Sequence, residues 1–287
     1  MNAVRPRRSA LYLPAANPRA IEKARTLAAD VVILDLEDSV GPDAKAEARA
    51  LAVAAVREGG FGPREVVIRV NGLDTPWGAD DLAAAAEAGP DAVLVPKIAG
   101  PANLAAYAQA LRGDTRLWAM VETCAAMFDL DALGRASREN RTDVWVIGAN
   151  DLVKEMRCRP GPDRAPLVPA LALSVMAARA HGLVILDGVY NAIEDLAGLE
   201  RECAQGRDLG FDGKTLIHPS HLAAANRVFA PEPADVVWAR TIQAAFDLPE
   251  NAGKGVIRVE NKMVERLHLA EARRLIGVAD AIAAHEV

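Results

Sequence analysis

The residues best suited to chemistry in this sequence are carboxylates that follow apolar runs. Glu122 is the last residue of one such run, and Asp151 lies three residues after the end of the next. A pair of carboxylates outside any cysteine or histidine ligand motif favours a hard divalent cation, completed by waters and substrate oxygens. The alternative is that Glu122 caps the following helix and Asp151 begins the next one, each solvated. The sequence has no HExxH motif, so we do not expect zinc.

Arg69 stands near the end of another apolar run, Val66–Asn71. A buried arginine needs a carboxylate partner. Asp35 and Glu37 are the candidates within the protein, and a substrate carboxylate gripped by two parallel hydrogen bonds is the functional alternative. The two interpretations are compatible, because acidic neighbours can orient the guanidinium group toward a ligand. The two-residue period of a strand places Asp35 and Glu37 on one side, where they would support Arg69.

Other polar residues follow the same kind of run. Asp38 adds a carboxylate beside Glu37, and we include both among the candidate catalytic residues. We expect Lys97 to be a charged structural lysine rather than a Schiff-base nucleophile. Asp187 and His218 are expected to be hydrogen-bond partners without a catalytic role.

These residues converge if the apolar runs are the parallel strands of one barrel. Several runs are rich in valine and isoleucine and continuous rather than alternating, as in strands buried on both faces. Helix-like segments separate most of them, and no GxGxxG motif follows the first run. The alternation predicts a TIM (β/α)₈ barrel, whose active site lies at the carboxyl ends of the strands. The eight runs are Ala10–Pro14, Val31–Asp35, Val66–Asn71, Ala92–Pro96, Leu117–Glu122, Val144–Gly148, Leu183–Val189 and Thr215–His218.

The regular alternation stops after the eighth run, which divides the chain. We assign residues 1–230 to the barrel and residues 231–287 to a C-terminal appendage that is too small to be independent. Within it, Val256–Val259 is expected to be extended, Glu260–Asn261 to form a turn and Arg266–Ala284 to be a helix. The appendage is expected to pack on its own barrel or on a neighbouring subunit.

The composition argues against two classes, nucleic-acid-binding proteins and membrane proteins. The chain has 287 residues, 51% of them hydrophobic, and a formal net charge of −6. This balance argues against a nucleic-acid-binding protein, which needs a basic face. No apolar run approaches the ~20 residues that span a bilayer, so we expect no membrane association. The three cysteines form no CxxC pair, and a reduced, cytoplasmic setting is expected.

Eight short motifs occur in an order and spacing that resemble the citrate lyase β-subunit-like family. This family includes malyl-CoA and citramalyl-CoA lyases and lies within the HpcH/HpaI aldolase superfamily. The resemblance covers nearly the whole chain. The motifs are RSALYLP from Arg8, DLEDSV from Asp35, VIRVN from Val67, VPK from Val95, ET at Glu122, GANDL from Gly148, GFDGK from Gly210 and IHPS from Ile217.

The resemblance implies a site and a ligand set. It implies Mg²⁺, with Mn²⁺ as a substitute, held by Glu122 and Asp151, and a 2-oxoacid gripped by Arg69. It also implies a CoA thioester substrate along the barrel mouth, where Arg19 and Lys23 are placed to contact its phosphates. Homotrimers or homohexamers are expected as the assembly.

The implied activity is a Mg²⁺-dependent carbon–carbon lyase that cleaves a 3-hydroxyacyl-CoA, such as a malyl-CoA or citramalyl-CoA, to acetyl-CoA and a 2-oxoacid. In CoA-type lyases an aspartate of the appendage reaches a neighbouring subunit's site as acid or base, whereas this chain has Glu265 there. The usual glycine after the first strand's proline is also replaced, by Ala15-Ala16. These departures keep two alternatives open. One is an acyl-CoA thioesterase on the same scaffold, and the other is a citrate lyase β subunit acting on an acyl-carrier-protein thioester, or a binding paralogue without turnover.

Overall fold

The computed structural model describes residues 5–285. The described residues divide into two compact units, one of residues Arg7–Phe229 and one of residues 230–285 together with residues 5–6.

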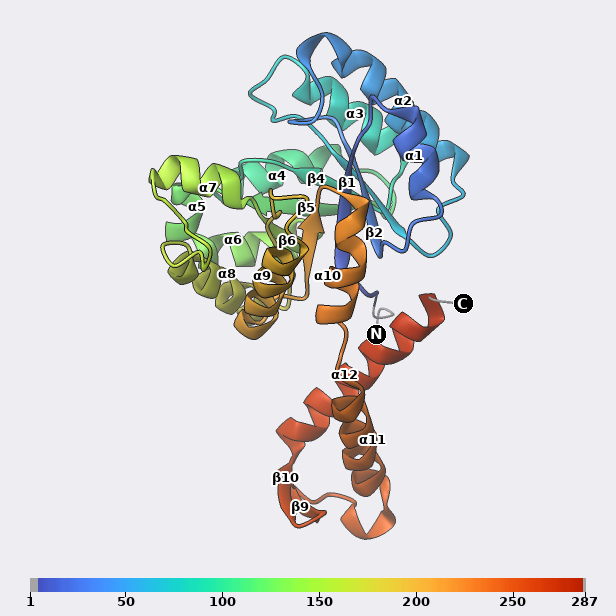
Figure 1. The fold of residues 1–287 in the computed structure, drawn as a ribbon, viewed down its shortest axis with the longest axis vertical. Coiled ribbons are helices and arrows are strands. Elements are labelled where there is room, and N and C mark those ends of the chain that lie inside the picture. Colours follow the sequence, from blue (N-terminus) through green and yellow to red (C-terminus); the bar gives the residue numbers. More distant parts are fainter. Residues whose placement is uncertain (1–4, 286–287) are drawn as a thin grey trace. The chain divides into compact units, whose positions relative to one another are not determined.

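The first unit is a closed barrel of eight parallel strands (Figure 1) in the order β1 to β8, with β8 pairing back onto β1. The predicted TIM barrel is therefore confirmed. The strands are β1 (Ser9–Pro14), β2 (Val31–Asp35), β3 (Glu65–Arg69), β4 (Ala92–Val95), β5 (Arg116–Val121), β6 (Thr142–Ile147), β7 (Val184–Asp187) and β8 (Gly213–Leu216).

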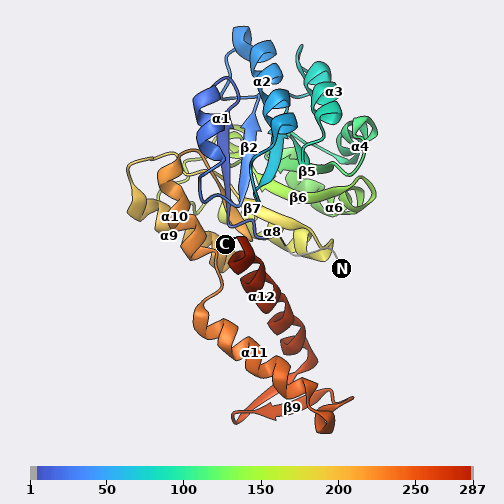
Figure 2. The ribbon, with the colours of Figure 1, turned by 90° about the vertical axis from the view of Figure 1, so that its right-hand side faces the viewer.

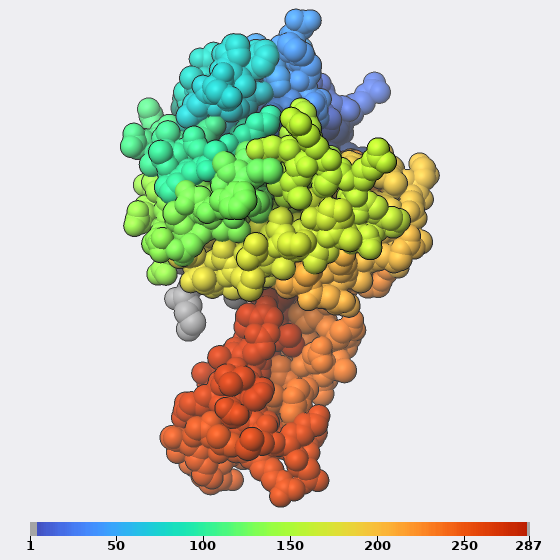
Figure 3. Space-filling view, turned by 90° about the vertical axis from the view of Figure 1, so that its left-hand side faces the viewer, coloured from blue at the N-terminus to red at the C-terminus, as the bar shows by residue number. Residues whose placement is uncertain are grey.

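Helices cover the outside of the barrel, and the space-filling view shows them as the outer surface on the side that carries α4 to α8 (Figure 3). They are α1 (Pro18–Ala24), η1 (Pro42–Ala44), α2 (Lys45–Glu58), α3 (Gly78–Ala88), α4 (Pro101–Ala110), α5 (Cys124–Phe128), α6 (Leu130–Glu139), α7 (Ala149–Met156), α8 (Val168–Ala180), α9 (Leu196–Leu209), η2 (Pro219–His221) and α10 (Leu222–Val228).

Strand alternation divides the hydrophobic core of the barrel unit into two layers. Leu11 and Leu13 of β1 belong to the larger layer between the strands and the helices. Tyr12, between them, belongs to the inner cluster, which also contains Trp118 and Met120 of β5. The side chains that point inward near the carboxyl ends of the strands therefore form the floor of the barrel mouth.

The second unit has its own small core. Figure 2 shows α11 (Pro233–Asp247) and α12 (Arg266–His285) side by side, with the hairpin of β9 (Val256–Val259) and β10 (Lys262–Glu265) at one end of the pair; η3 (Pro249–Asn251) precedes β9. Ile242 and Phe246 of α11 pack with Ile276 of α12 in a separate hydrophobic cluster.

Six of the eight predicted apolar runs extend one or two residues past the end of the strand. β5 ends at Val121, so Glu122 follows the strand rather than ending it. β8 ends at Leu216, and His218 instead caps η2 by accepting a hydrogen bond from the backbone N–H of Ser220. The helix α7 was not predicted, because it has only eight residues, too few for the helical spacing of Ala149, Leu152, Val153 and Met156 to stand out.

No helix within residues 5–285 combines the length and the apolar character that a membrane span requires.

Candidate active site

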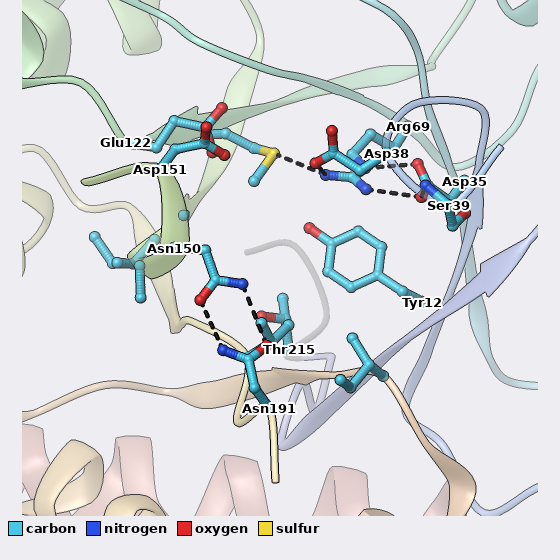
Figure 4. Close-up of a pocket in the computed structure, with 16 residues that line it drawn as sticks. Tyr12, Asp35, Asp38, Ser39, Arg69, Glu122, Asn150, Asp151, Asn191 and Thr215 are labelled. Atoms are coloured by element: carbon cyan, nitrogen blue, oxygen red, sulfur yellow. Dashed lines mark hydrogen bonds and ion pairs between the residues drawn. The ribbon is translucent and has the colours of Figure 1, made fainter. Parts of the chain in front are cut away.

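A pocket opens at the carboxyl ends of the barrel strands, and Figure 4 shows its residues converging from β1, β2, β3 and β5 and from the segments after β6 and β7. This is the edge of the barrel at which the sequence predicts the active site. The pocket is lined by Tyr12, Asp35, Asp38, Ser39, Arg69, Met120, Glu122, Ile147, Gly148, Ala149, Asn150, Asp151, Val189, Asn191, Thr215 and Ile217.

Glu122 is a buried carboxyl whose two oxygens have different surroundings. Its Oε1 accepts a hydrogen bond of 2.7 Å from the backbone N–H of Lys97. Its Oε2 is buried and has no partner among the described residues. Burial, reinforced by the charges of Glu37 and Asp151, raises the pKa of Glu122 to about 8 although the Lys97 bond opposes it. The carboxylate form is therefore costly unless a cation stands beside Oε2.

The backbone around Glu122 is shaped to hold it. Lys97 has a φ of 53°, a left-handed conformation that is uncommon outside glycine, and this residue presents the N–H that binds Oε1. Gly148 lies on the other side, where a Cβ atom would stand 1.9 Å from Glu122 Oε2. Only glycine leaves room for the carboxyl group in this position.

Asp151 reaches the same pocket from the first turn of α7. The register of β5 and β6 pairs Val121 with Ile147, so the residues that follow the two strands emerge level with each other. Asp151 lies four residues past Ile147, half-buried at the pocket wall. Figure 4 shows its carboxylate beside that of Glu122.

This pair fits a hard cation that keeps most of its coordination for water and ligand oxygens. The charge of Asp151 helps to raise the pKa of Glu122, as expected of two close carboxylates. Within residues 5–285, no group of three or more histidine, cysteine, aspartate or glutamate residues could hold a metal ion. Two carboxylate oxygens are ligands that fit Mg²⁺.

Arg69 is held by the carboxylates that the sequence placed beside it. β2 and β3 pair Asp35 with Arg69, and the two side chains form parallel bonds of 2.6 and 2.7 Å. Burial alone would raise the pKa of Asp35, but the charge and hydrogen bonds of Arg69 outweigh it and lower that pKa. Arg69 Nη1 also lies 2.8 Å from Glu37. The guanidinium group is thereby fixed at the pocket wall.

Glu37 and Asp38 differ sharply in position. Glu37 is buried, pairs with Arg69 and Lys97, and is not among the pocket-lining residues. Asp38 lines the pocket, its side chain is 64% exposed, and its only ion pair among the described residues is a long one of 3.4 Å with Arg69. Asp38 is thus the carboxylate that solvent and ligand can reach.

Lys97 behaves as expected of a charged structural lysine. Its Nζ lies 3.2 Å from Glu37 Oε1. Burial alone would lower its pKa, but the charge of Glu37 and the hydrogen bond to it prevail and raise the pKa. Asp187 is fully buried between Lys214 and Arg164, 2.8 Å from each.

Besides Glu37, three predicted site residues lie outside the pocket lining. Arg19 and Lys23 are exposed on α1. Glu265 is the last residue of β10 in the second unit, and its backbone N–H donates to His268 Nδ1. The roles assigned to these three residues stay predictions.

The structure adds site residues that the sequence analysis missed. Tyr12 lines the pocket with its ring stacked on Arg69, the guanidinium carbon being 4.6 Å from the ring centroid. Asn191, in the segment after β7, was also missed, and it exchanges two hydrogen bonds, of 3.2 and 2.8 Å, with Asn150 of α7. The clue to Tyr12 was present, since a tyrosine in the middle of an otherwise aliphatic strand calls for a partner for its hydroxyl group.

The chain is similar along nearly its whole length to proteins with named activities. A (3S)-malyl-CoA thioesterase of Cereibacter sphaeroides is 50% identical over 279 residues, covering 97% of this chain and 96% of that protein. An L-malyl-CoA/β-methylmalyl-CoA lyase of the same species is 30% identical over 98% of this chain and 96% of the lyase.

The expectation of a carbon–carbon lyase as the main activity is therefore wrong. Similarity to the thioesterase, at 50% over nearly the full length, far exceeds the 30% found for the lyase. The motifs that suggested a lyase occur in a chain that is 50% identical to a thioesterase, so they do not distinguish the two activities. The alternative of a thioesterase is the one that the comparison favours.

Solved structures agree on the scaffold. The crystal structure of the protein CitE from Mycobacterium tuberculosis, in complex with magnesium, acetoacetate and coenzyme A, matches with a TM-score of 0.74 and 29% identity. The match covers 95% of this chain and 97% of that one. Magnesium and coenzyme A are thus ligands of a relative with the same fold.

The family model described as HpcH/HpaI aldolase/citrate lyase matches residues 8–219, which include every strand of the barrel. This chain is an enzyme of the HpcH/HpaI aldolase/citrate lyase family.

Proposed function

We propose that this chain is an acyl-CoA thioesterase that hydrolyses the thioester of a short 3-hydroxy dicarboxylic acid, of which (3S)-malyl-CoA is the leading candidate. The observation that carries the proposal is the 50% identity over 97% of the chain to (3S)-malyl-CoA thioesterases. The pocket supports it, because Arg69 and a cation held by the paired carboxylates would together match the negative charge of an acyl group with a free carboxylate.

Glu122 and Asp151 are proposed to hold Mg²⁺. The unpartnered Oε2 of Glu122 and the neighbouring carboxylate of Asp151 supply two hard oxygen ligands. When bound, the cation would supply Lewis-acid polarisation and orientation of the acyl oxygens. Crystals of a relative with magnesium, pyruvate and acetoacetate as ligands support this choice of metal.

The remaining polar residues are assigned by their surroundings. Arg69, fixed by Asp35 and Glu37, keeps its positive charge at the pocket wall, where it attracts the acyl group's anionic end. Asp38 is assigned the role of accepting the proton of the attacking water, because it is the carboxylate that both lines the pocket and is open to solvent. Glu37 is assigned a positioning role through Arg69.

The proposal is tested by thioester hydrolysis across a substrate panel. Release of free thiol from (3S)-malyl-CoA is compared with that from butyryl-CoA, which has the same chain length but neither the hydroxyl nor the distal carboxylate. We expect kcat/KM to be higher for malyl-CoA by at least ~100-fold, because butyryl-CoA leaves the pocket's buried charges unpaired. Equal rates for both thioesters would contradict the assigned substrate class.

A further inference from the structure

The side chain of Tyr12 is placed to act on a ligand. β1 directs it into the barrel, and it is 9% exposed. Figure 4 shows its hydroxyl group pointing toward the middle of the pocket, away from the wall where Asp35 and Ser39 lie. The ring is stacked against Arg69, which fixes its direction.

The hydroxyl group of Tyr12 has no hydrogen-bond partner among the described residues. A buried hydroxyl normally has one, since leaving it unpaired costs free energy. Of the buried side-chain atoms without a partner in the described part of the chain, those on pocket-lining residues are this hydroxyl and Glu122 Oε2. The hydroxyl group can donate a hydrogen bond, and the carboxyl oxygen can accept one. A ligand that satisfies both must bring an acceptor for the hydroxyl group and a cation or proton for the carboxyl oxygen.

The neighbouring donors are already engaged. Arg69 Nε and Nη2 bind Asp35, and its Nη1 lies against Glu37. Asn150 and Asn191 donate to each other, while Thr215 Oγ1 donates to the backbone carbonyl of Asp187. Among the buried donor atoms of the pocket lining within residues 5–285, the Tyr12 hydroxyl is the one that has no hydrogen-bond partner.

The acceptor can be identified from the chemistry of the acyl group. A 3-hydroxy dicarboxylic thioester has three oxygen-bearing groups: the distal carboxylate, the hydroxyl group and the thioester carbonyl. The distal carboxylate and the hydroxyl group suit the side of the pocket where Arg69 and the cation proposed at Glu122 and Asp151 supply positive charge. The thioester carbonyl oxygen remains for a donor elsewhere in the pocket.

We infer that the Tyr12 hydroxyl donates a hydrogen bond to the thioester carbonyl oxygen and stabilises the negative charge that develops on it during hydrolysis. This inference rests on the proposed function. Tyr12 is then a catalytic residue, and the substrate supplies the acceptor that its hydroxyl lacks.

The chemistry balances without a further reactant. The oxygen of water forms a bond to the thioester carbon, and the carbonyl electron pair moves onto the oxygen that Tyr12 contacts. That pair returns as the C–S bond breaks, and the proton taken from water by Asp38 passes to the departing sulfur. Tyr12 keeps its proton throughout, since burial raises the pKa of its phenol well above the ordinary value. A neutral donor of this kind binds an oxyanion more strongly than a carbonyl.

The test is Tyr12→Phe, which removes the hydroxyl group and keeps the ring against Arg69. Loss of one donor to an oxyanion lowers kcat on the order of 100-fold, and we expect the KM for (3S)-malyl-CoA to change little. The melting temperature should be unchanged or higher, because an unpaired buried hydroxyl is removed. If Tyr12 had only a structural role, Tyr12→Phe would instead lower the melting temperature and leave the kcat of the folded protein unchanged.

Tyr107→Phe is the matched control. Tyr107 is also buried, but its hydroxyl group accepts a hydrogen bond from the backbone N–H of Leu73 and it does not line the pocket. Its kcat should equal that of the wild type. An unchanged kcat in Tyr12→Phe, with active wild-type enzyme, would overturn the inference alone. A wild-type protein that releases no free CoA would overturn the proposed function and this inference together.

A binding measurement distinguishes which oxygen Tyr12 contacts. The probe is the thioether analogue of malyl-CoA, in which a methylene group replaces the thioester carbonyl. Its Kd, measured by calorimetry with Mg²⁺, should be the same for wild type and Tyr12→Phe. Weaker binding of the analogue to Tyr12→Phe would mean that the hydroxyl holds the acyl carboxylate or hydroxyl group, and would contradict the assignment.

Discussion

At the scale of single residues, charge in the pocket is compensated unevenly. Arg69 is paired with Asp35 and Glu37, whereas the inner oxygen of Glu122 has no partner within residues 5–285. A buried carboxyl group in this state must be protonated or must bind a cation. The geometry thus locates the point where a metal would lower the free energy most.

Replacing Glu122 by glutamine tests that point. Glu122→Gln keeps the volume and the acceptor for the Lys97 N–H but removes the charge. We expect Mg²⁺ affinity and kcat/KM each to fall by at least ~100-fold, as measured by calorimetry and by thiol release. Glu155→Gln is the control, because Glu155 lies on α7 outside the pocket lining. Undiminished Mg²⁺ binding by Glu122→Gln would contradict the ligand assignment.

The sequence sufficed for residues whose type and position together imply a role. Glu122, Asp151 and Arg69 follow strand ends, so the topology of a barrel was enough to predict that they meet. The separate surroundings of Glu37 and Asp38 were not predictable, because adjacent residues of a loop can point in different directions. Tyr12 was missed because an aromatic residue inside a strand is usually part of the core.

At the scale of elements, the junction between β6 and α7 determines how closely Glu122 approaches the backbone. Gly148→Ala would place a Cβ atom 1.9 Å from Glu122 Oε2 and force that side chain to move. We expect a loss of kcat/KM of at least ~100-fold, since a shift of ~1 Å at a reacting group has effects of this size. Gly41→Ala is the control, because no atom lies within 4 Å of its Cβ position and its φ is −66°. Equal activity of the two variants would show that Glu122 does not need its present position.

A buried ionic cluster holds β7 and β8 to the segment before α8. Asp187 lies 2.8 Å from both Lys214 and Arg164, and Lys214 also binds Glu202. Burial alone would raise the pKa of Asp187, but the charges of Lys214 and Arg164 outweigh it and lower that pKa. The stability that this carboxylate contributes is therefore complete above its unfolded pKa of 3.8 and is lost as the pH falls through the lower folded value.

Asp187→Asn should destabilise the protein by about 3–5 kcal/mol at pH 7, because it leaves buried cations partly uncompensated. The difference in free energy of unfolding between wild type and variant should shrink only as the pH falls below 4, measured by denaturant unfolding from pH 7 to pH 3. A difference that vanished already at pH 6 would contradict the lowered pKa.

Elements were predictable where apolar runs are long and breakers mark their ends. β9 has the expected bounds, Val256–Val259, and α12 begins at Arg266, where the sequence places it. The apolar spacing also predicts one helix over Ala125–Ser137, which the structure divides at Asp129 into α5 and α6. Periodicity cannot show this break, because the apolar pattern continues across it and the change of direction depends on packing against the barrel.

At the scale of the whole molecule, the C-terminal appendage carries Glu265, and the property to test is whether this residue acts within its own subunit or on another one. The family resemblance predicts that this carboxylate serves the site of a neighbouring subunit. We expect Glu265→Ala and Glu122→Ala each to be nearly inactive, and mixing the two after dissociation and reassembly to restore about a quarter of the wild-type activity if the subunits exchange randomly and each site draws on two chains. No recovery, with subunit exchange verified by mass, would contradict action in trans.

The central claim is hydrolysis of the thioester, and the identity of the products tests it most directly. Purified protein is incubated with Mg²⁺ and (3S)-malyl-CoA, the reaction is quenched during the first turnovers, and the products are identified by mass. We predict free CoA and intact malate in equal amounts. Acetyl-CoA and glyoxylate as the main products would contradict the account.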